Sequence, residues 1–140
     1  MPHGNDLTYA IVIPRSDPFA AESVARSYAE IHAALARCIP GAALAPENAA
    51  ANAACFAGPV RADVVLEGSK VAGAAQRRGR FGVLHQGSVQ GIAIPDGLAR
   101  EFADALAGEV VEGELNSAVL EEAGRLVAAR YGSEAWQKRR

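Results

Sequence analysis

Lysine is scarce in this sequence. Of the 14 cationic residues twelve are arginine, and only Lys70 and Lys138 are lysine. Burial readily shifts the pKa of a lysine amine, whereas an arginine guanidinium stays charged. Lys70, the one lysine outside the C-terminal tail, is therefore the first candidate for chemistry. The competing hypothesis is that Lys70 is an ordinary solvated residue of a hairpin.

Cysteine and long apolar runs are scarce as well. Cys38 and Cys55 are the two cysteines, and their spacing fits neither a zinc site nor a redox pair, so we expect free thiols and no metal. No apolar run approaches the roughly 20 residues that a membrane span needs. The first residues do not form a secretory signal. These absences predict a cytoplasmic protein without membrane contact.

The chain has little net charge, with a formal value of −2. Its two basic clusters are too short to form a nucleic-acid face, so we expect no nucleic-acid partner. The C-terminal cluster covers residues 138–140, and the internal one contains Arg77, Arg78 and Arg80. The internal cluster is either a solvated turn or a contact for an acidic protein surface.

What the sequence does contain is typical of one globular domain. Half of the 140 residues are apolar and 21% are charged. A chain of this length buries roughly two thirds of the surface that its unfolded form exposes. It can therefore build one hydrophobic core without disulfides or metals.

The first half of the chain predicts a strand followed by a helix. Residues 7–13 are aromatic and β-branched and stop at Pro14, with Asp6 at the entrance. Ser16 or Asp17 then offers a helix N-cap with Pro18 just inside. Apolar residues recur at helical spacing up to the Pro40-Gly41 stop. Residues 45–54 predict a loop.

The second half predicts a meander and two helices. Residues 64–66 and 71–75 flank the hairpin connection Glu67-Gly68-Ser69, so Lys70 begins the returning strand. A third extended segment covers 81–94, in which Gly82, Gly87 and Gly91 mark bulges or close backbone approaches. Helices are expected from Pro95 to Leu106 and from Asn116 to Tyr131. This order predicts an α+β domain with helices covering one face of a mostly antiparallel sheet.

Several segments resemble the lipoate-protein ligase A and octanoyltransferase family. They are Cys55-Phe-Ala-Gly-Pro59, Asp63, Gly68-Ser-Lys70-Val-Ala-Gly73-Ala-Ala-Gln-Arg-Arg78, Leu84-His85-Gln-Gly87-Ser88 and His3-Gly-Asn-Asp6-Leu-Thr-Tyr9. The resemblance implies the biotin and lipoate ligase catalytic fold, which is related to class II aminoacyl-tRNA synthetases. The family's arginine pair and run of three glycines upstream of His3 are not in the sequence. We therefore expect residues 1–140 to be a single, N-terminally truncated catalytic domain.

The resemblance also implies a chemistry for particular residues. Family members transfer an octanoyl or lipoyl group to a lysine of a lipoyl carrier domain or glycine-cleavage carrier protein, and the residue matching Lys70 lies against the acyl carbonyl. One group of octanoyltransferases carries a Cys-Phe dipeptide fifteen residues before that lysine, as Cys55 does here, and uses its thiol as the acyl acceptor. Lys70 and Cys55 are thus the expected catalytic residues. The expected substrate-binding residues are His3, Asp6, Tyr9, Asp63, Gly73, Ala74, His85 and Gly87.

Three functional hypotheses remain open at this stage. The first is an octanoyltransferase that needs no cofactor and takes its acyl group from acyl carrier protein through a Cys55 thioester. The second is a lipoate ligase that uses ATP and magnesium and passes through an adenylate. The third is an inactive fragment or an accessory subunit that binds a lipoyl domain or a complementary N-terminal chain.

Base rates favour structural roles for the other candidates. Cys38 is expected to be a small buried hydrophobe. His3 and His85 are more often structural histidines than bases, although the resemblance adds weight to His3. His32, in the middle of the first helix, has no evident companion and is expected either to lie at the surface or to pack in the core.

Overall fold

The computed structural model describes residues 6–46 and 60–138. The chain divides into two compact units, Met1–Glu109 and Val110–Arg140. Among the described residues, no helix has the length and apolar character needed to cross a membrane.

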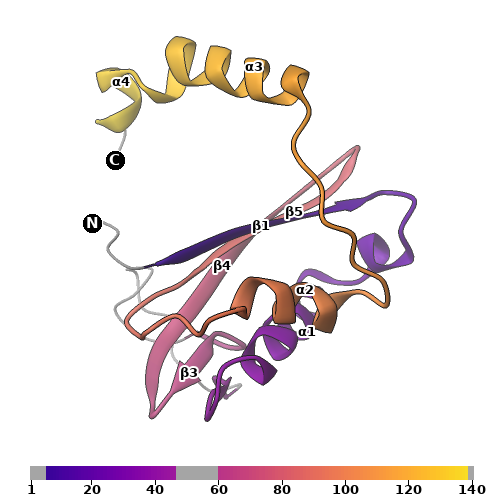
Figure 1. Ribbon diagram of the computed structural model, residues 1–140, viewed down its shortest axis with the longest axis vertical. Coiled ribbons are helices and arrows are strands. Elements are labelled where there is room, and N and C mark those ends of the chain that lie inside the picture. The colour runs from indigo at the N-terminus through magenta and orange to yellow at the C-terminus, as the bar shows by residue number, and fades with distance from the viewer. Residues whose placement is uncertain (1–5, 47–59, 139–140) are drawn as a thin grey trace. The chain divides into compact units, whose positions relative to one another are not determined.

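The first unit is built on a five-stranded sheet. The strands pair in the order β1-β5-β4-β3-β2 and every pair is antiparallel (Figure 1). Their bounds are Leu7–Pro14 for β1, Ala43–Leu44 for β2, Val64–Leu66 for β3, Ser69–Gly79 for β4 and Gly82–Val89 for β5. The meander of β3, β4 and β5 confirms the predicted hairpins. The two-residue strand β2 was not predicted, because it is too short to show a period.

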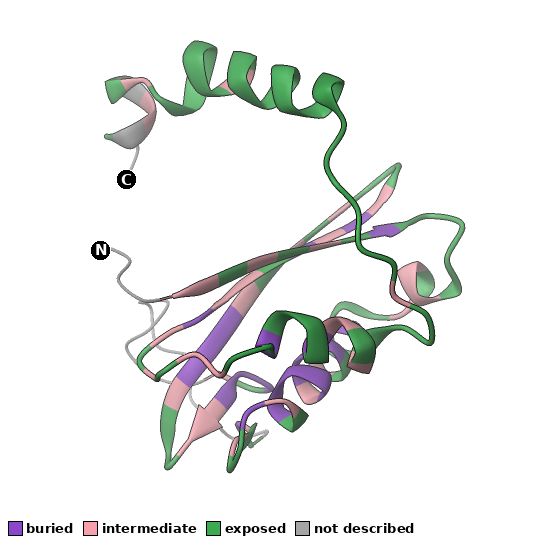
Figure 2. Cartoon of the chain, viewed as in Figure 1, coloured by how far each residue is buried: buried purple, intermediate pink, exposed green. Residues whose placement is uncertain are grey.

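Helices cover one face of this sheet, so the predicted α+β class is confirmed. Helix α1 (Val24–Arg37) packs against β3 and against helix α2 (Leu98–Leu106). The residues coloured as buried lie mainly on these helices and on the central strands of the sheet (Figure 2). The largest fully buried apolar ones are Ile31, Leu35, Val64, Val89 and Leu98.

The first predicted helix is divided into two parts. Asp17 caps the short 3-10 helix η1 (Pro18–Ala21), and its carboxylate accepts a 2.8 Å hydrogen bond from the Phe19 amide. The backbone then becomes extended at Glu22 and at Ser23, and Ser23 caps α1. The prediction that one helix begins at Ser16 or Asp17 was therefore wrong for α1, because Ser23 supplies a second cap.

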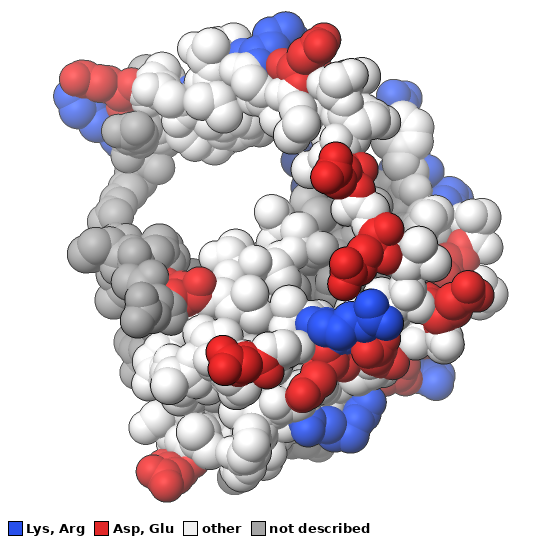
Figure 3. All heavy atoms as spheres, viewed as in Figure 1, with Lys and Arg blue, Asp and Glu red and all other residues white. Residues whose placement is uncertain are grey.

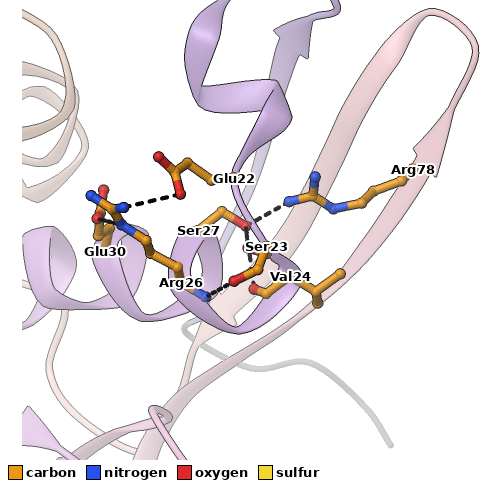
Figure 4. A network of polar contacts seen from close by, with 7 residues as sticks. All are labelled: Glu22, Ser23, Val24, Arg26, Ser27, Glu30 and Arg78. Atoms are coloured by element: carbon orange, nitrogen blue, oxygen red, sulfur yellow. Dashed lines mark hydrogen bonds and ion pairs between the residues drawn. The ribbon is translucent and has the colours of Figure 1, made fainter.

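Arg78 attaches the end of β4 to the first turn of α1. Its Nη2 donates to the Ser27 hydroxyl at 2.7 Å, and that hydroxyl donates to the Ser23 carbonyl at 2.9 Å (Figure 4). Nη1 of Arg78 donates to the Ala20 carbonyl at 3.0 Å. The interpretation of this arginine as part of a solvated turn was wrong, since its guanidinium bridges two elements.

The third predicted strand is shorter than expected. The run 81–94 gives β5 only as far as Val89, because Gly91 takes a left-handed conformation with φ of 75°. The predicted helix that follows begins at Leu98, after the turn that contains Pro95.

The second unit is helical. Asn116 caps α3 (Ser117–Leu126), which continues as a π-helical segment η2 (Val127–Tyr131) and is followed by α4 (Glu134–Gln137). The predicted cap at Asn116 and the predicted end at Tyr131 are confirmed.

Charges of both signs alternate along the helices of the two units. Ion pairs between residues three or four apart include Arg26 with Glu30, Arg100 with Asp104 and Arg125 with Glu122. On the face drawn in Figure 3, blue and red atoms of the described residues are interspersed.

Gly82 provides a test of the sheet register. Its φ is 140°, and a Cβ atom there would lie 2.0 Å from the Ile13 carbonyl oxygen. We expect Gly82→Ala to lower the free energy of unfolding by about 2–4 kcal/mol. Gly79→Ala is the matched control, since its Cβ would meet nothing within 4 Å, and it should change stability by less than about 0.5 kcal/mol. Urea denaturation measures both, and equal effects would contradict the register.

Candidate functional site

A fully buried carboxylate, that of Asp63, organises the candidate site. Its Oδ2 lies 2.8 Å from Nζ of Lys70 and accepts a 2.9 Å hydrogen bond from the Val60 amide. Its Oδ1 accepts a 2.7 Å hydrogen bond from the Tyr28 hydroxyl. A buried charge is tolerated only with such partners, and the Lys70 ammonium supplies the opposite charge.

Lys70 is the buried partner rather than a solvated hairpin residue. Only 8% of its side chain is exposed. The hairpin before it is a tight turn in which Glu67 and Gly68 both have positive φ, 50° and 80°, as a two-residue loop requires. The hairpin pairs Leu66 with Ser69 and Val65 with Lys70, and a bulge after Lys70 shifts the next pair to Val64 and Ala72. The hairpin thus places Lys70 at the start of β4.

Gly73 leaves the space that the ammonium occupies. A Cβ atom at Gly73 would lie 2.6 Å from Cε and 2.7 Å from Nζ of Lys70, and 3.3 Å from Oδ1 of Asp63. A larger residue at this position would displace the lysine. Gly73, which the resemblance placed among the substrate-binding residues, therefore makes room for the Lys70 side chain.

Tyr28 closes the sheet edge beside this pair. Strand β3 pairs with β4 only as far as Ala72. The amide of Ala74, two residues further, donates to the Tyr28 hydroxyl at 3.0 Å, and the Ala74 carbonyl lies 3.3 Å from the same hydroxyl. The Tyr28 side chain, from helix α1, thus meets the backbone groups of Ala74 that a neighbouring strand would otherwise pair with. Burial, followed by the hydrogen bond to Asp63, raises the pKa of Tyr28, so its hydroxyl stays protonated.

A pocket of about 280 Å³ borders this edge, lined by Tyr28, Val60, Ala62, Ala74, Val24, Ala25 and Arg61. A larger one of about 470 Å³ lies away from Lys70, between β1, α1 and α2, and its lining includes Ile11, Phe19, Ile31 and Leu106. Although it is larger, the second pocket has none of the buried polar groups of the site. We therefore centre the candidate site on the first.

Tyr9, Gly87 and Ala74 form one row across three strands. The register pairs Tyr9 with Gly87 and Gly87 with Ala74. A Cβ at Gly87 would lie 2.4 Å from the Tyr9 hydroxyl, so the glycine leaves the room that the Tyr9 side chain occupies. The hydroxyl lies 3.3 Å from Nε2 of His32 and 3.5 Å from Nε2 of His85. Burial raises the pKa of Tyr9, and the charge of Asp63 adds to the effect.

Two histidines fill the layer beneath this row, and both are fully buried. Burial lowers the pKa of His32. Burial and the nearby His32 ring lower the pKa of His85 to about 4, so both rings are neutral at pH 7. The rings lie 5.4 Å apart, and that of Tyr28 lies 4.1 Å from His32. The prediction that His32 has no companion was wrong.

The structure brings most predicted residues together. Lys70 and Asp63 form the ion pair, and Gly73 and Ala74 lie beside it. Tyr9, Gly87 and His85 form the adjoining layer. Asp6 is half-buried at the entrance of β1, at the sheet end that carries Lys70. Cys55 and His3 lie outside the described residues.

Three residues of the site were not predicted as functional: Tyr28, His32 and Gln76. Tyr28 and His32 are four residues apart and therefore lie on one face of α1. That spacing was a usable signal, because two polar rings on the buried face of a helix need partners. The Gln76 amide lies 3.0 Å from Nδ1 of His85.

Cys38 has the structural role expected for it. It is half-buried, and its thiol donates to the Ala34 carbonyl at 3.3 Å. Burial raises the pKa of this thiol, with a further contribution from Glu101. Within residues 6–46 and 60–138, no group of three or more histidine, cysteine or acidic side chains could hold a metal ion.

The fold and the buried ion pair define an α+β domain with a charged site at the edge of its sheet. Residues 1–91, more than half of the chain, match the family model described as the lipoyl protein ligase A/B catalytic domain. The chain therefore belongs to this family, which confirms the resemblance seen in the sequence. The match includes all five strands and α1.

Curated relatives carry the name octanoyltransferase LipM. That of Brevibacillus brevis is 30% identical over 100 residues, covering 62% of this chain and 36% of the relative. That of Kyrpidia tusciae is 26% identical over 193 aligned positions, covering 99% of this chain and 70% of the relative. The chain thus spans about a third of one relative and about two thirds of the other. No solved structure gives a significant match.

The neutral His85 predicts a pH dependence of stability. Its pKa is about 4 in the folded protein and about 6.5 in an unfolded chain. The unfolded state binds more protons between these values, so stability is full above pH 6.5 and is lost as pH falls toward 4. We expect the wild-type free energy of unfolding to fall by about 2 kcal/mol more than that of His85→Asn between pH 7 and 4.5. Parallel urea titrations measure this difference, and identical pH profiles would contradict a neutral buried ring.

Proposed function

We propose that this chain acts in the transfer of an octanoyl or lipoyl group to a lysine of a lipoyl carrier domain or glycine-cleavage carrier protein. Family membership and the relatives named octanoyltransferase support this proposal. The observation that carries it is the buried Lys70 ammonium held 2.8 Å from Asp63. Because the chain spans only part of the length of these relatives, the enzymatic activity itself is part of the proposal.

Lys70 has the chemical role of stabilising charge on the acyl oxygen. Acyl transfer builds negative charge on the carbonyl oxygen as the tetrahedral intermediate forms. A donor that is already in place at that oxygen stabilises the transition state by roughly 3–4 kcal/mol. An ammonium has three N–H donors, so it can hold Asp63 and also donate to an acyl oxygen. Its low exposure strengthens such an interaction, because water screens it less.

Cys55 is the proposed acyl carrier. Its thiolate attacks the thioester carbonyl of octanoyl acyl carrier protein, forms a new thioester and releases the donor's thiol. The neutral amine of the acceptor lysine then attacks this Cys55 thioester, an amide forms, the amine loses a proton and the Cys55 thiol is restored. Both steps start from an activated thioester, so this route needs no cofactor. The segment that carries Cys55 joins the described chain at Val60, whose amide donates to Asp63.

An ATP-dependent lipoate ligase is the second candidate, because the matching family model includes lipoyl protein ligases. In that case Lys70 would face the carbonyl of an acyl phosphate rather than a thioester. The two reactions differ in their products, since only the ligase consumes ATP, with magnesium as its cofactor, and releases pyrophosphate. A pyrophosphate assay with free lipoate, ATP and magnesium separates them.

The thioester hypothesis predicts a specific mass change. After incubation with octanoyl acyl carrier protein, we expect one octanoyl group on the chain, located at Cys55 by peptide mapping and removed by neutral hydroxylamine. Cys55→Ala should abolish this adduct and acyl transfer to the carrier domain. Cys38→Ala is the matched control and should retain both, since Cys38 contacts a helix carbonyl and has a raised pKa.

Three other outcomes would point to a different function for the chain. Full carrier acylation by Cys55→Ala would contradict the thioester route, and pyrophosphate release would favour the ligase. Binding of the carrier domain without acylation under either condition would favour an accessory subunit.

A further inference from the structure

The turn that presents Asp63 adopts a strained conformation. The Asp63 amide donates to the Val60 carbonyl at 3.0 Å, which closes a turn over Arg61 and Ala62. Ala62 has φ of 63° although it is not glycine. Such a left-handed conformation is unfavourable for alanine and persists only where the surroundings hold it. Contacts from neighbouring residues must therefore hold Ala62 in this conformation.

Two hydrogen bonds hold the Ala62 backbone. Its amide donates to the Ala45 carbonyl at 3.2 Å. Its carbonyl lies 2.7 Å from Nδ1 of the fully buried His32. Because a carbonyl oxygen can only accept, Nδ1 of His32 carries the proton. The shorter of the two contacts thus comes from a histidine for which sequence analysis found no companion.

The protonated Nδ1 defines the remaining contacts of the neutral ring. Nε2 of His32 has a free lone pair, so it accepts from the Tyr9 hydroxyl at 3.3 Å. The Tyr9 oxygen then accepts from Nε2 of His85 at 3.5 Å, and Nδ1 of His85 accepts from the Gln76 amide at 3.0 Å. The hydrogen bonds therefore run in one direction, from β4 through β5, β1 and α1 to the Ala62 carbonyl.

We propose that His32 is the positioning residue for the Lys70 ammonium. It donates to the Ala62 carbonyl, stabilises the left-handed turn and so orients the Asp63 carboxylate that pairs with Lys70. As a statement about catalysis the inference rests on the proposed function, in which Lys70 meets the acyl oxygen. The geometric part, in which His32 orients Asp63 through the Ala62 turn, does not depend on the proposed function.

A packing role and a positioning role make different demands on the ring. Packing among Tyr28, Tyr9 and His85 requires its volume, whereas positioning requires a donor at Nδ1. Asparagine places its amide nitrogen where Nδ1 lies, and glutamine places its amide group near Nε2. Both substitutions remove the ring. His32→Asn can keep the bond to Ala62, and His32→Gln loses it.

The two lysines of the chain make the test direct. A sample labelled with ¹³C and ¹⁵N in lysine gives two side-chain sets in an NMR spectrum, from Lys70 and from the exposed Lys138, which is the internal control. We expect a separate Lys70 signal in the wild type and in His32→Asn. In folded His32→Gln, the Lys70 signal should move toward that of Lys138. An unchanged Lys70 signal in folded His32→Gln would overturn the inference.

A measurement on the wild type covers the case in which His32→Gln does not fold. Histidine labelled with ¹⁵N reports which ring nitrogen carries the proton. The inference requires the Nδ1–H tautomer at His32, and finding the proton on Nε2 would overturn it.

Kinetics connect the geometry to the proposed function. In carrier acylation, kcat of His32→Gln should fall by about 10- to 100-fold, as a displaced catalytic group does, with the KM for the carrier domain within about twofold. His32→Asn should restore kcat to within a few fold of the wild type. If the lysine signals respond as expected and the wild type transfers no acyl group, the positioning role stands and the proposed function fails.

Discussion

The buried ion pair between Asp63 and Lys70 is the interaction on which the site depends. Neither charge is stable in the interior alone, because its desolvation must be offset by a partner of opposite charge. The pair therefore requires the other contacts around it: the Tyr28 hydroxyl, the Val60 amide and the open space over Gly73. Each of these supports the same ammonium position at the start of β4.

The sheet register explains why a helix contributes to a strand-edge site. Strand β3 is short, so Ala74 extends beyond its last pair with β4 and meets the Tyr28 hydroxyl instead. One turn later on α1, His32 reaches the turn that precedes β3. The same helix face thus satisfies the strand edge and holds the carboxylate. A rigid support of this kind is what a preorganised charge requires, since an ammonium that moved freely would lose much of its effect on an acyl oxygen.

Local pattern predicted most of the strands and the hairpin that carries Lys70. The turn Glu67-Gly68 between β-forming residues is a short-range signal, and the structure confirms it. The burial of Lys70 was not predictable in this way, because it depends on the ion pair with Asp63. Helical spacing predicted the helix that contains Tyr28, yet the hydrogen bond from Tyr28 to Asp63 joins residues 35 apart in the sequence. Contacts at that separation have no local signature, which is why the histidine layer was missed.

The chemistry came from resemblance rather than from composition. The scarcity of lysine directed attention to Lys70, but only the motif around it suggested an acyl oxygen as its target. The structure contributes what neither source contained, namely the pairing of Asp63 with Lys70, the strained Ala62 turn and the directed series of hydrogen bonds that ends there.

A double-mutant cycle between Asp63→Asn and Lys70→Met tests the central interaction most directly. Asp63→Asn leaves the Lys70 ammonium without its anion, and Lys70→Met leaves the Asp63 carboxylate without its cation. We therefore expect each single substitution to lower the free energy of unfolding by about 3–5 kcal/mol. The double variant should lose less than the sum of the two, with a coupling of about 2–3 kcal/mol. Effects that add to within about 0.5 kcal/mol would contradict a buried ion pair at this site.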